Sequence, residues 1–457
     1  MVKPRSSSFP VKKENFRHFI ADRKGNGCSD NGRSVFFPRR KTQVGFRHSR
    51  GKAMRGFGFK ALLTMVFFAP LGAAQTTETK PAEVVPPARE ADAQGGNPSK
   101  YYGGADLILW WMKGQALPAL VTSSPSGTPS NQAGVPGTPG FSTLYGLSNV
   151  NNSLRSGGKF NAGVWVDEEN NLGFEADFLF LESKASRYLA ESGGDPILAR
   201  PFTDAQSGIP ASIRVAFPGD LAGSIAVQTE SGGLVGGGIS MRQNISSMQT
   251  ESFRLEGIAG YRAMTFTETI SISQSMVSIN PNNPNFVAVG TRIDSFDRFL
   301  TSNTFNGFEI GLAGKIFRGP LTILLDGRMA LGMNHNSADV YGSTTATVPG
   351  VAPVTSLGGL YALSSNIGSH GHQSVSILPQ LTTKVAYQFT DMVNLSFGYN
   401  LLVWSSVSRA GGDIDQTVNP NLLPGSSLLG GPIRPGFGFE QNTFWAQGFS
   451  LGMEVNY

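Results

Sequence analysis

The sequence has 457 residues, of which 15% are charged and 57 are glycine, and its mean hydropathy is −0.11. This is too polar for a bundle of transmembrane helices, but it suits a β-barrel, in which only alternate residues face lipid. The formal charge of +5 is uneven: residues 1–60 carry 16 Lys and Arg against 3 Asp and Glu, a net of +13, so residues 61–457 carry 5 − 13 = −8. The basic character therefore belongs to the leader and does not indicate nucleic-acid binding by the folded part.

The leader has the layout of a secretory signal peptide. Lys60 precedes an apolar run of about eleven residues that ends in Gly72-Ala-Ala74, which is too short to span a bilayer as a helix. We expect cleavage after Ala74, so residues 1–74 form the leader and signal. Translation is expected to start at Met54, because the preceding residues are far longer than a usual basic segment; a real long pre-sequence is the alternative.

The expected mature chain contains no cysteine, because the only one, Cys28, lies in the leader. It is therefore expected to have no disulfide bond and no thiol chemistry. Residues 75–100 are rich in Pro, Glu, Ala and Gln and contain almost no large apolar residues. They are predicted to form a flexible periplasmic linker.

From Tyr101 onward, apolar and polar residues alternate in successive segments. Strand side chains point alternately to two faces, so each segment is predicted to be a strand with one apolar and one polar face. We identify ten such strands: 101–111, 159–166, 172–180, 234–245, 253–273, 304–317, 321–333, 375–389, 394–404 and 444–457. Long loops, of roughly 30 to 50 residues, and short turns alternate between them.

This pattern predicts an all-β fold: a transmembrane antiparallel up-and-down β-barrel of about 10 strands that covers residues 101–457. Bacterial outer-membrane barrels have even strand numbers, short periplasmic turns and long external loops, whereas soluble sandwiches have no reason to alternate loop lengths strictly. A hairpin hidden in a long loop would give 12 strands instead. The first long loop, rich in Pro, Ser and Gly, is expected to contribute no packed core element.

The final segment indicates where the protein resides. Its alternation continues to the last residue and it ends on an aromatic, which resembles the C-terminal assembly signal of bacterial outer-membrane barrels. We therefore expect location in the bacterial cell outer membrane, with outer-membrane lipid and the barrel-assembly machinery as partners. Closure of the ring requires this strand to pair with residues 101–111. Its predicted lipid-facing residues are Phe449, Leu451, Met453, Val455 and Tyr457.

Charged residues on the polar faces are predicted to point into the lumen. Because both signs are mixed, they are expected to form a network that closes on itself, and a ten-strand barrel is too narrow for general diffusion. These residues are Asp106, Glu175, Asp177, Arg254, Glu256, Arg262, Glu309, Lys315, Asp326, Arg328 and Lys384, together with Lys159 and Arg242. The tryptophans Trp110, Trp111, Trp165, Trp404 and Trp445 are predicted to form interfacial aromatic girdles, with core packing as the alternative.

Residues with catalytic or metal-binding chemistry are sparse. His370 and His372 are two residues apart, but no carboxylate cluster stands nearby, so no metal site is predicted. His335 is the only histidine placed for a base at a strand end, and it lacks an identifiable partner. Asp413 and Asp415 make a weak candidate for Ca²⁺ and are more readily explained by Asx turns. We expect no cofactor and no catalytic residues.

Several strand blocks resemble a family of outer-membrane β-barrel proteins of unassigned function, found mainly in planctomycete-type bacteria. The matching segments are 105–111, 117–122, 154–158, 198–202, 303–307, 365–368, 398–404, 413–415 and 418–420. The resemblance covers roughly residues 101–457, and it implies fold and location without bringing catalytic residues.

Three functions follow as hypotheses. The first is a structural or surface-interaction role through the long extracellular loops, with an unidentified surface partner. The second is a narrow channel for small solutes. The third, a membrane-embedded hydrolase, is the least supported, and we expect the protein not to be an enzyme.

Overall fold

The computed structural model describes residues 100–457, except 246–251, 283–286, 427 and 429. The predicted leader and residues 75–99 of the predicted linker lie outside the described residues. In the described part, the chain forms β-strands and a single-turn 3-10 helix, η1 (Pro420–Leu422). No helix among these residues is long and apolar enough to cross a bilayer.

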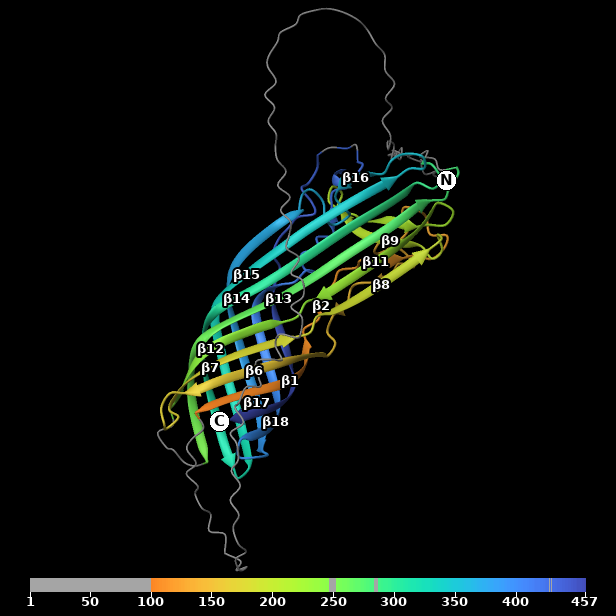
Figure 1. Cartoon of the computed structure of the whole chain (residues 1–457). Helices are drawn as coiled ribbons and strands as arrows, with labels where there is room; N and C mark the ends of the chain where they lie inside the picture. The colour runs from red at the N-terminus through yellow and green to blue at the C-terminus, as the bar shows by residue number, and fades with distance from the viewer. Residues whose placement is uncertain (1–99, 246–251, 283–286, 427, 429) are drawn as a thin grey trace, which may run out of the picture. The chain divides into compact units, whose positions relative to one another are not determined.

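Ten antiparallel strands form a closed ring (Figure 1). They are β1 (Tyr101–Met112), β6 (Arg155–Trp165), β7 (Leu172–Leu181), β12 (Val235–Asn244), β13 (Phe253–Ser278), β14 (Arg292–Arg318), β15 (Leu321–Thr347), β17 (Gly368–Gln388), β18 (Val393–Ser408) and β20 (Gln441–Asn456). Each pairs with the next in this order, and β20 pairs with β1. The predicted ten-strand up-and-down barrel is confirmed, and the twelve-strand alternative is wrong.

The last strand closes the ring as expected. Leu107 of β1 lies opposite Leu451 of β20, and the backbones of Tyr101 and Tyr457 exchange hydrogen bonds with N···O distances of 2.8 and 2.7 Å. Neither strand is left with a free edge, which a bilayer would not tolerate because unpaired backbone groups are costly in hydrocarbon. On the outer face of β20, the exposed fractions are 42% for Phe449, 53% for Leu451, 49% for Met453 and 71% for Tyr457, with Val455 half-buried.

Three strands are far longer than a membrane crossing requires. β13, β14 and β15 contain 26, 27 and 27 residues, whereas about 9–11 residues span a bilayer. They continue past the ring at the end that carries the long loops, which we call the long-loop end (Figure 1). There β11 (Leu221–Ser231) pairs with β13, β8 (Lys184–Ser192) pairs with β11, and β16 (Val354–Leu357) pairs with β15. We call this part, together with the long loops, the cap.

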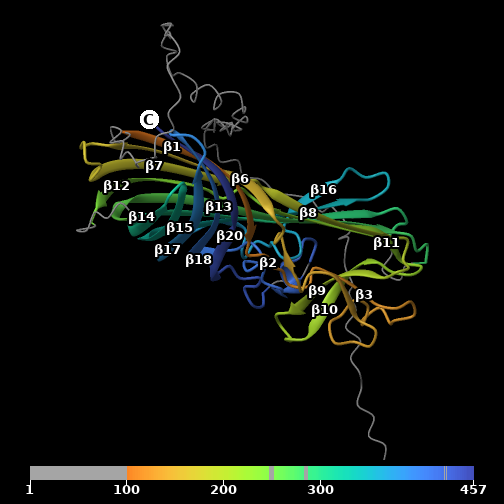
Figure 2. The same cartoon turned by 90° about the horizontal axis from the view of Figure 1, so that it is seen from below.

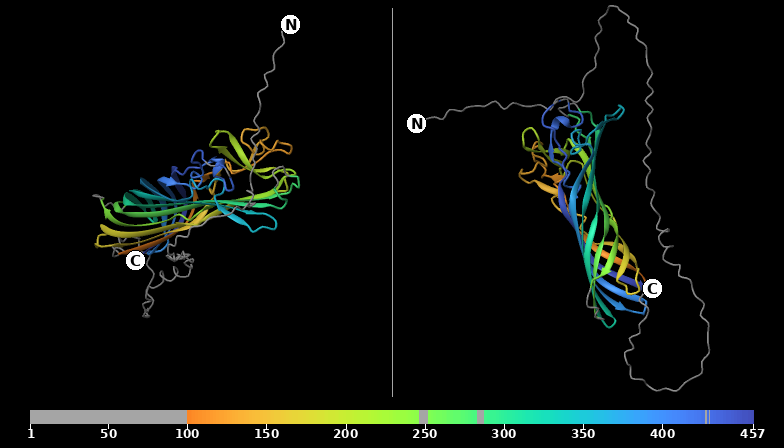
Figure 3. Two further views of the ribbon diagram at one scale, coloured as in Figure 1. Left: turned by 90° about the horizontal axis from the view of Figure 1, so that it is seen from above. Right: turned by 90° about the vertical axis from the view of Figure 1, so that its left-hand side faces the viewer.

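The long loops contain further strands. β3 (Val121–Ser123), β4 (Ser142–Tyr145), β9 (Leu198–Asp204), β10 (Pro210–Ala216) and β19 (Thr417–Val418) form a second sheet, and β2 (Gln115–Ala116) pairs with β5 (Asn149–Val150). Figures 2 and 3 show β3, β9 and β10 grouped at the long-loop end. Hidden hairpins therefore exist, but they belong to the cap and do not enlarge the ring.

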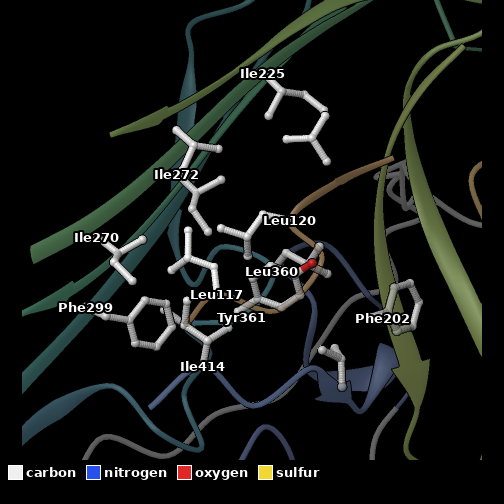
Figure 4. Close-up of a cluster of buried hydrophobic side chains, with 14 of the residues drawn as sticks. Leu117, Leu120, Phe202, Ile225, Ile270, Ile272, Phe299, Leu360, Tyr361 and Ile414 are labelled. Carbon is white, nitrogen blue, oxygen red and sulfur yellow. The ribbon is translucent and has the colours of Figure 1, made fainter. Parts of the chain in front are cut away.

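One face of the extended sheet is covered by the loops. Ile270, Ile272 and Phe299 of the long strands pack against Leu117 and Leu120 of the first loop, and Leu360, Tyr361 and Ile414 come from two others (Figure 4). The expectation that the first loop contributes no core element is wrong. Its few apolar residues are buried because the extended strands offer them an apolar face, which the composition of the loop does not reveal.

A charge on the outer face of β20 is expected to impair assembly. Leu451→Arg places a guanidinium against lipid, which costs about 2–4 kcal/mol near the middle of the bilayer. We expect less folded barrel in the membrane, measured by the heat-dependent gel shift of membrane fractions. The control, Ile433→Arg, changes a cap side chain that is 80% exposed and should insert normally. Equal insertion of both variants would contradict the lipid-facing assignment.

Candidate functional site

The lumen near the short turns is crossed by a layer of paired charges, which we call the ionic layer. Arg262 of β13 binds Glu309 of β14 through Nε and Nη2, at 2.8 and 3.0 Å. On its other side it binds Asp177 of β7 at 2.5 and 2.8 Å. All three side chains are at most 6% exposed. Two carboxylates thus hold one guanidinium in bidentate geometry, which fixes its plane as well as its position.

Other pairs extend the ionic layer across the lumen. Arg328 of β15 donates to Glu175 of β7 at 2.9 Å, although four pairing steps separate these strands around the ring. Glu175 also accepts from Arg242 at 2.7 Å, and Arg242 lies 3.1 Å from Glu256. Because Arg328 and Glu175 sit on opposite walls, their ion pair occupies the space that a pore would need, and the pairs between neighbouring strands extend the layer from it.

The structure places every predicted lumen charge at this layer, and nearly all of them in ion pairs. Lys384 forms an ion pair with Asp106 at 2.7 Å. Glu256 also forms ion pairs with Arg254 at 2.8 Å and with Lys315 at 3.6 Å. The remaining carboxylate, Asp326, binds Arg328 at 2.9 Å. Lys159 makes no ion pair in the part of the chain that the structure describes.

An apolar layer fills the lumen above the ionic layer, toward the long loops. Ile108 and Met112 of β1, Phe266 of β13, Phe305 of β14 and Phe444 of β20 are at most 1% exposed and belong to one cluster. Phe266 and Phe444 have ring centroids 4.7 Å apart. The barrel interior is therefore a packed core at this level.

The predicted aromatic girdle is wrong for three of the five tryptophans. Trp110, Trp165 and Trp404 are 3%, 6% and 0% exposed and lie inside the barrel. Trp404 packs against Phe305 in the apolar layer, and the Arg254 guanidinium lies 4.5 Å from the centre of the Trp165 ring. Only Trp111 and Trp445 have the outward register that an interface requires. The alternation in the sequence already indicates the inward direction, because Trp110 shares a strand face with Asp106 and Trp404 shares one with Asn400.

Buried asparagines link the top of the apolar layer to the cap. The Asn303 amide donates to the Ser408 carbonyl at 2.9 Å and accepts from the Ser408 backbone N–H at 2.8 Å. Asn336 donates to Asn303 and to the Ser406 carbonyl, at 3.2 and 3.0 Å. Both asparagines are fully buried. They hold the end of β18 across the mouth of the barrel, and the sequence offered no pattern that singled them out.

Two buried ion pairs hold the cap in place. Arg409, which follows β18, binds Glu268 of β13 at 2.5 and 2.7 Å. Arg200 of β9 binds Asp297 of β14 at 2.7 Å, with both side chains fully buried. Asp297 also accepts three backbone N–H groups from residues 360–362 at 2.8–3.0 Å. One carboxylate therefore joins the second sheet, a long loop and the extended strand.

The predicted candidate histidines lie on the outer face of the sheet or in contacts within the cap. His335 lies on the outward face of β15, opposite Thr304 and Gln373 of the neighbouring strands. His370 bonds the Asn366 carbonyl at 2.9 Å and stacks on Phe437, with centroids 3.8 Å apart. Among the residues that the structure describes, no group of three or more His, Cys, Asp or Glu side chains is placed to hold a metal ion.

Asp413 and Asp415 have different environments. Asp415 accepts the Thr417 backbone N–H at 2.8 Å, which is the expected Asx turn, and binds Arg434 at 2.7 Å. Asp413 is 3% exposed, and its carboxyl group faces the Glu440 backbone and the Ser408 side chain without a hydrogen bond of ordinary geometry among the described residues. Burial, and then the Glu440 carboxylate, raise the pKa of Asp413 to about 7.

The closed ring, the apolar outer face and the ion-paired lumen define the class: this is a transmembrane β-barrel of the bacterial outer membrane. The family described as "Putative beta barrel porin-7" matches residues 102–457. The chain belongs to this family.

Comparison with other proteins adds distant similarities. The outer-membrane protease OmpT from Escherichia coli aligns with a TM-score of 0.36 and 8% identity, over 80% of this chain and 99% of that one. The toluene transporter TodX from P. putida aligns with a TM-score of 0.19 and 9% identity, over 79% of this chain and 91% of that one. A FadL homologue from Pseudomonas aeruginosa aligns with a TM-score of 0.22 and 9% identity, over 78% of this chain and 90% of that one. No curated protein matches this sequence.

Removing one partner of the ionic layer is expected to destabilise the barrel. Arg262→Ala leaves the buried Asp177 and Glu309 with only the longer contacts to Arg328, at 3.6 and 3.4 Å, and breaking a buried ion pair in this way costs up to about 3–5 kcal/mol. The measurement is the urea concentration or temperature at which the folded gel mobility is lost. The matched control is Arg292→Ala, whose ion pair with Asp294 is 55% and 41% exposed and contributes about 0–1 kcal/mol. Equal stability of the two variants would contradict the role of the ionic layer.

The cap is expected to lose stability as the pH rises. The folded-state pKa of Asp413, about 7, lies above the ordinary value, so the folded state binds more protons than the unfolded state between about pH 4 and 7. The stabilising effect of the neutral carboxyl is complete below about pH 4 and is lost as the pH rises to about 7. Asp413→Asn should abolish this dependence and make the cap more resistant to proteolysis at pH 8, but not at pH 4. Identical pH dependence of proteolysis in the wild type and in Asp413→Asn would contradict the role of the Asp413 carboxyl group.

Proposed function

We propose that the protein is a closed membrane anchor that presents the cap at the cell surface for interaction with surface components. The observation that carries this proposal is the double obstruction of the lumen. The ionic layer and the apolar layer both fill the barrel interior, and Arg328 and Glu175 connect opposite walls at 2.9 Å. A solute path would require both layers to rearrange.

The cap supports a surface role because its long loops pack into a folded unit with its own core, instead of forming separate flexible loops. Its core joins segments from four long loops to the extended strands, and Arg200 and Asp297 form a fully buried ion pair within it. Rigid, pre-organised surfaces bind with a smaller entropic cost than mobile loops do. In outer-membrane barrels the long loops lie outside the cell, which would place the cap there.

The proposal includes the assembly route. The outward residues of β20 and its terminal aromatic fit recognition by the barrel-assembly machinery, and the apolar outer face fits outer-membrane lipid. A planctomycete-type source is part of the same proposal, on the strength of the family resemblance. The narrow channel remains the competing function, and the hydrolase has no support from the position of His335 on the outer face.

Conductance separates the anchor from the channel. The purified full chain, reconstituted in planar bilayers, should give no reproducible single-channel steps at neutral pH. The structural reason is that the apolar layer, which includes the fully buried Phe305 and Phe444, fills the barrel interior above the ionic layer. Reproducible conductance of the wild-type protein would contradict the proposal.

Surface labelling tests the orientation of the cap. Leu147→Cys lies in the first long loop and is 70% exposed in the wild-type chain, so a membrane-impermeant maleimide should label it on intact cells. Asp391→Cys, in the short turn between β17 and β18, is the matched control and should react only after lysis. Labelling of Asp391→Cys alone on intact cells would overturn the proposed orientation.

A further inference from the structure

The outward face of the long strands changes character along their length. At Phe308 and Leu331 the outer face is apolar, and these side chains are 60% and 58% exposed. From the level of Asn306 toward the cap, the outward face becomes rich in hydroxyl groups. On β13 the six consecutive outward residues from that level toward the cap are Ser or Thr, namely Thr265, Thr267, Thr269, Ser271, Ser273 and Ser275. Hydroxyl groups both donate and accept hydrogen bonds, so this face suits a polar ligand.

A hollow of about 320 Å³ lies within this hydroxyl-rich face. Its floor consists of small side chains on adjacent strands, since Ala226 of β11 is paired with Ser273 of β13. On the other side of Ser273, its partner is Phe296 of β14. Phe296 forms a wall, and its ring centroid lies 6.2 Å from that of Tyr341. The small residues leave the space that the aromatic side chains border.

Charged groups border the same hollow. Arg292 and Asp294 both line it, and their ion pair is largely exposed, with Nε and Oδ1 2.9 Å apart. Arg298, beside Phe296 on the outward face of β14, is exposed and makes no ion pair in the described part of the chain. The hollow therefore offers the Asp294 carboxylate, the Arg292 guanidinium, serine hydroxyls and an aromatic ring around one concavity, with Arg298 nearby on the same face.

This combination fits a sugar ring better than a peptide. The C–H face of a hexose packs on an aromatic ring, while its hydroxyls bond with carboxylate, guanidinium and serine groups. A peptide that binds a sheet usually adds a strand to a free edge. Here β11, β13 and β14 are each paired on both sides, so the floor has no free backbone groups to offer.

The position of the hollow indicates which sugar it would meet. Phe296 lies ten residues beyond Asn306, where the apolar outer face ends, a distance of about 33 Å along the strand. The hollow faces the same direction as the lipid-contacting wall, so it is continuous with that interface. In an outer membrane, the groups that lie above the hydrocarbon at this height are the sugars that outer-leaflet glycolipids carry.

We propose that the hollow bordered by Phe296, Ser273 and Asp294 binds the glycan part of an outer-leaflet glycolipid. This inference rests on the proposed function, because it assigns a ligand class to the cap of the closed anchor. The hollow would then be the binding site for the proposed surface interaction, through which the cap binds the sugars of the lipids around its own barrel.

The test uses the full chain in detergent and, as the probe, oligosaccharides released by mild acid from the outer-membrane glycolipid of the source bacterium. Ser273→Leu fills the floor of the hollow, and Phe296→Ala removes its aromatic wall. Each should weaken binding about tenfold or more, which corresponds to about 1.4 kcal/mol. The matched control, Ser302→Leu, lies on the same outward face of β14, six residues from Phe296, and should bind as the wild type does.

Unchanged binding by Ser273→Leu and Phe296→Ala, or no binding by the wild type, would overturn the assignment. So would binding of a random-peptide library at this hollow without binding of the released sugars. The heat-dependent gel shift of each variant shows whether it is folded. Failure here is distinguishable from failure of the proposed function, because the absence of conductance and the labelling of Leu147→Cys do not depend on the hollow.

Discussion

The structure depends on the rule that no backbone hydrogen-bonding group can be left unpaired in hydrocarbon. The rule forces β20 back onto β1, and the exchange of hydrogen bonds between Tyr101 and Tyr457 completes the ring. Once the ring is closed, strand alternation divides the residues into an outer face for lipid and an inner face for the lumen. The positions of Leu451 and Asp106 follow from that division.

The inner face solves a second problem, which is how to fill a narrow barrel. Near the short turns the solution is electrostatic: Arg262 is shared by Asp177 and Glu309, and Glu175 is shared by Arg242 and Arg328. Each of these charged side chains has at least one opposite charge in contact, so none of them is left buried alone, which would be the costly case. Toward the long loops the filling is apolar. The two layers meet between Asp106 and Ile108, within a single strand.

The ring, the strand number and the ion-paired residues could be predicted because they follow a local period of two residues. The apolar layer left a local sign as well. Residues 107–112 are all apolar, without alternation, as expected for a strand that is covered on both faces. The prediction is wrong for Trp110, Trp165 and Trp404 because position along a strand does not decide which face a side chain lies on. Trp110 has the parity of Asp106 and points inward with it.

The cap could not be predicted in the same way, because its contacts join distant parts of the chain. Arg200 and Asp297 are 97 residues apart, and nothing near either residue marks the other as its partner. Leu117 and Leu120 stand in a loop rich in Pro, Ser and Gly, so its composition suggests solvent. The hydroxyl-rich face on β13 is visible in the sequence, but the hollow depends on Ala226 and Phe296 from neighbouring strands.

The uninterrupted length of β13, β14 and β15 has a mechanical consequence. Each strand runs without a break through both the barrel wall and the cap, so continuous backbone joins the two. A pull on the cap along these strands loads many interstrand hydrogen bonds in parallel, as a shear, instead of opening them one after another. Such an attachment would resist tension far better than a domain tethered by a single linker, and force applied at the surface would be transmitted directly into the membrane-embedded wall.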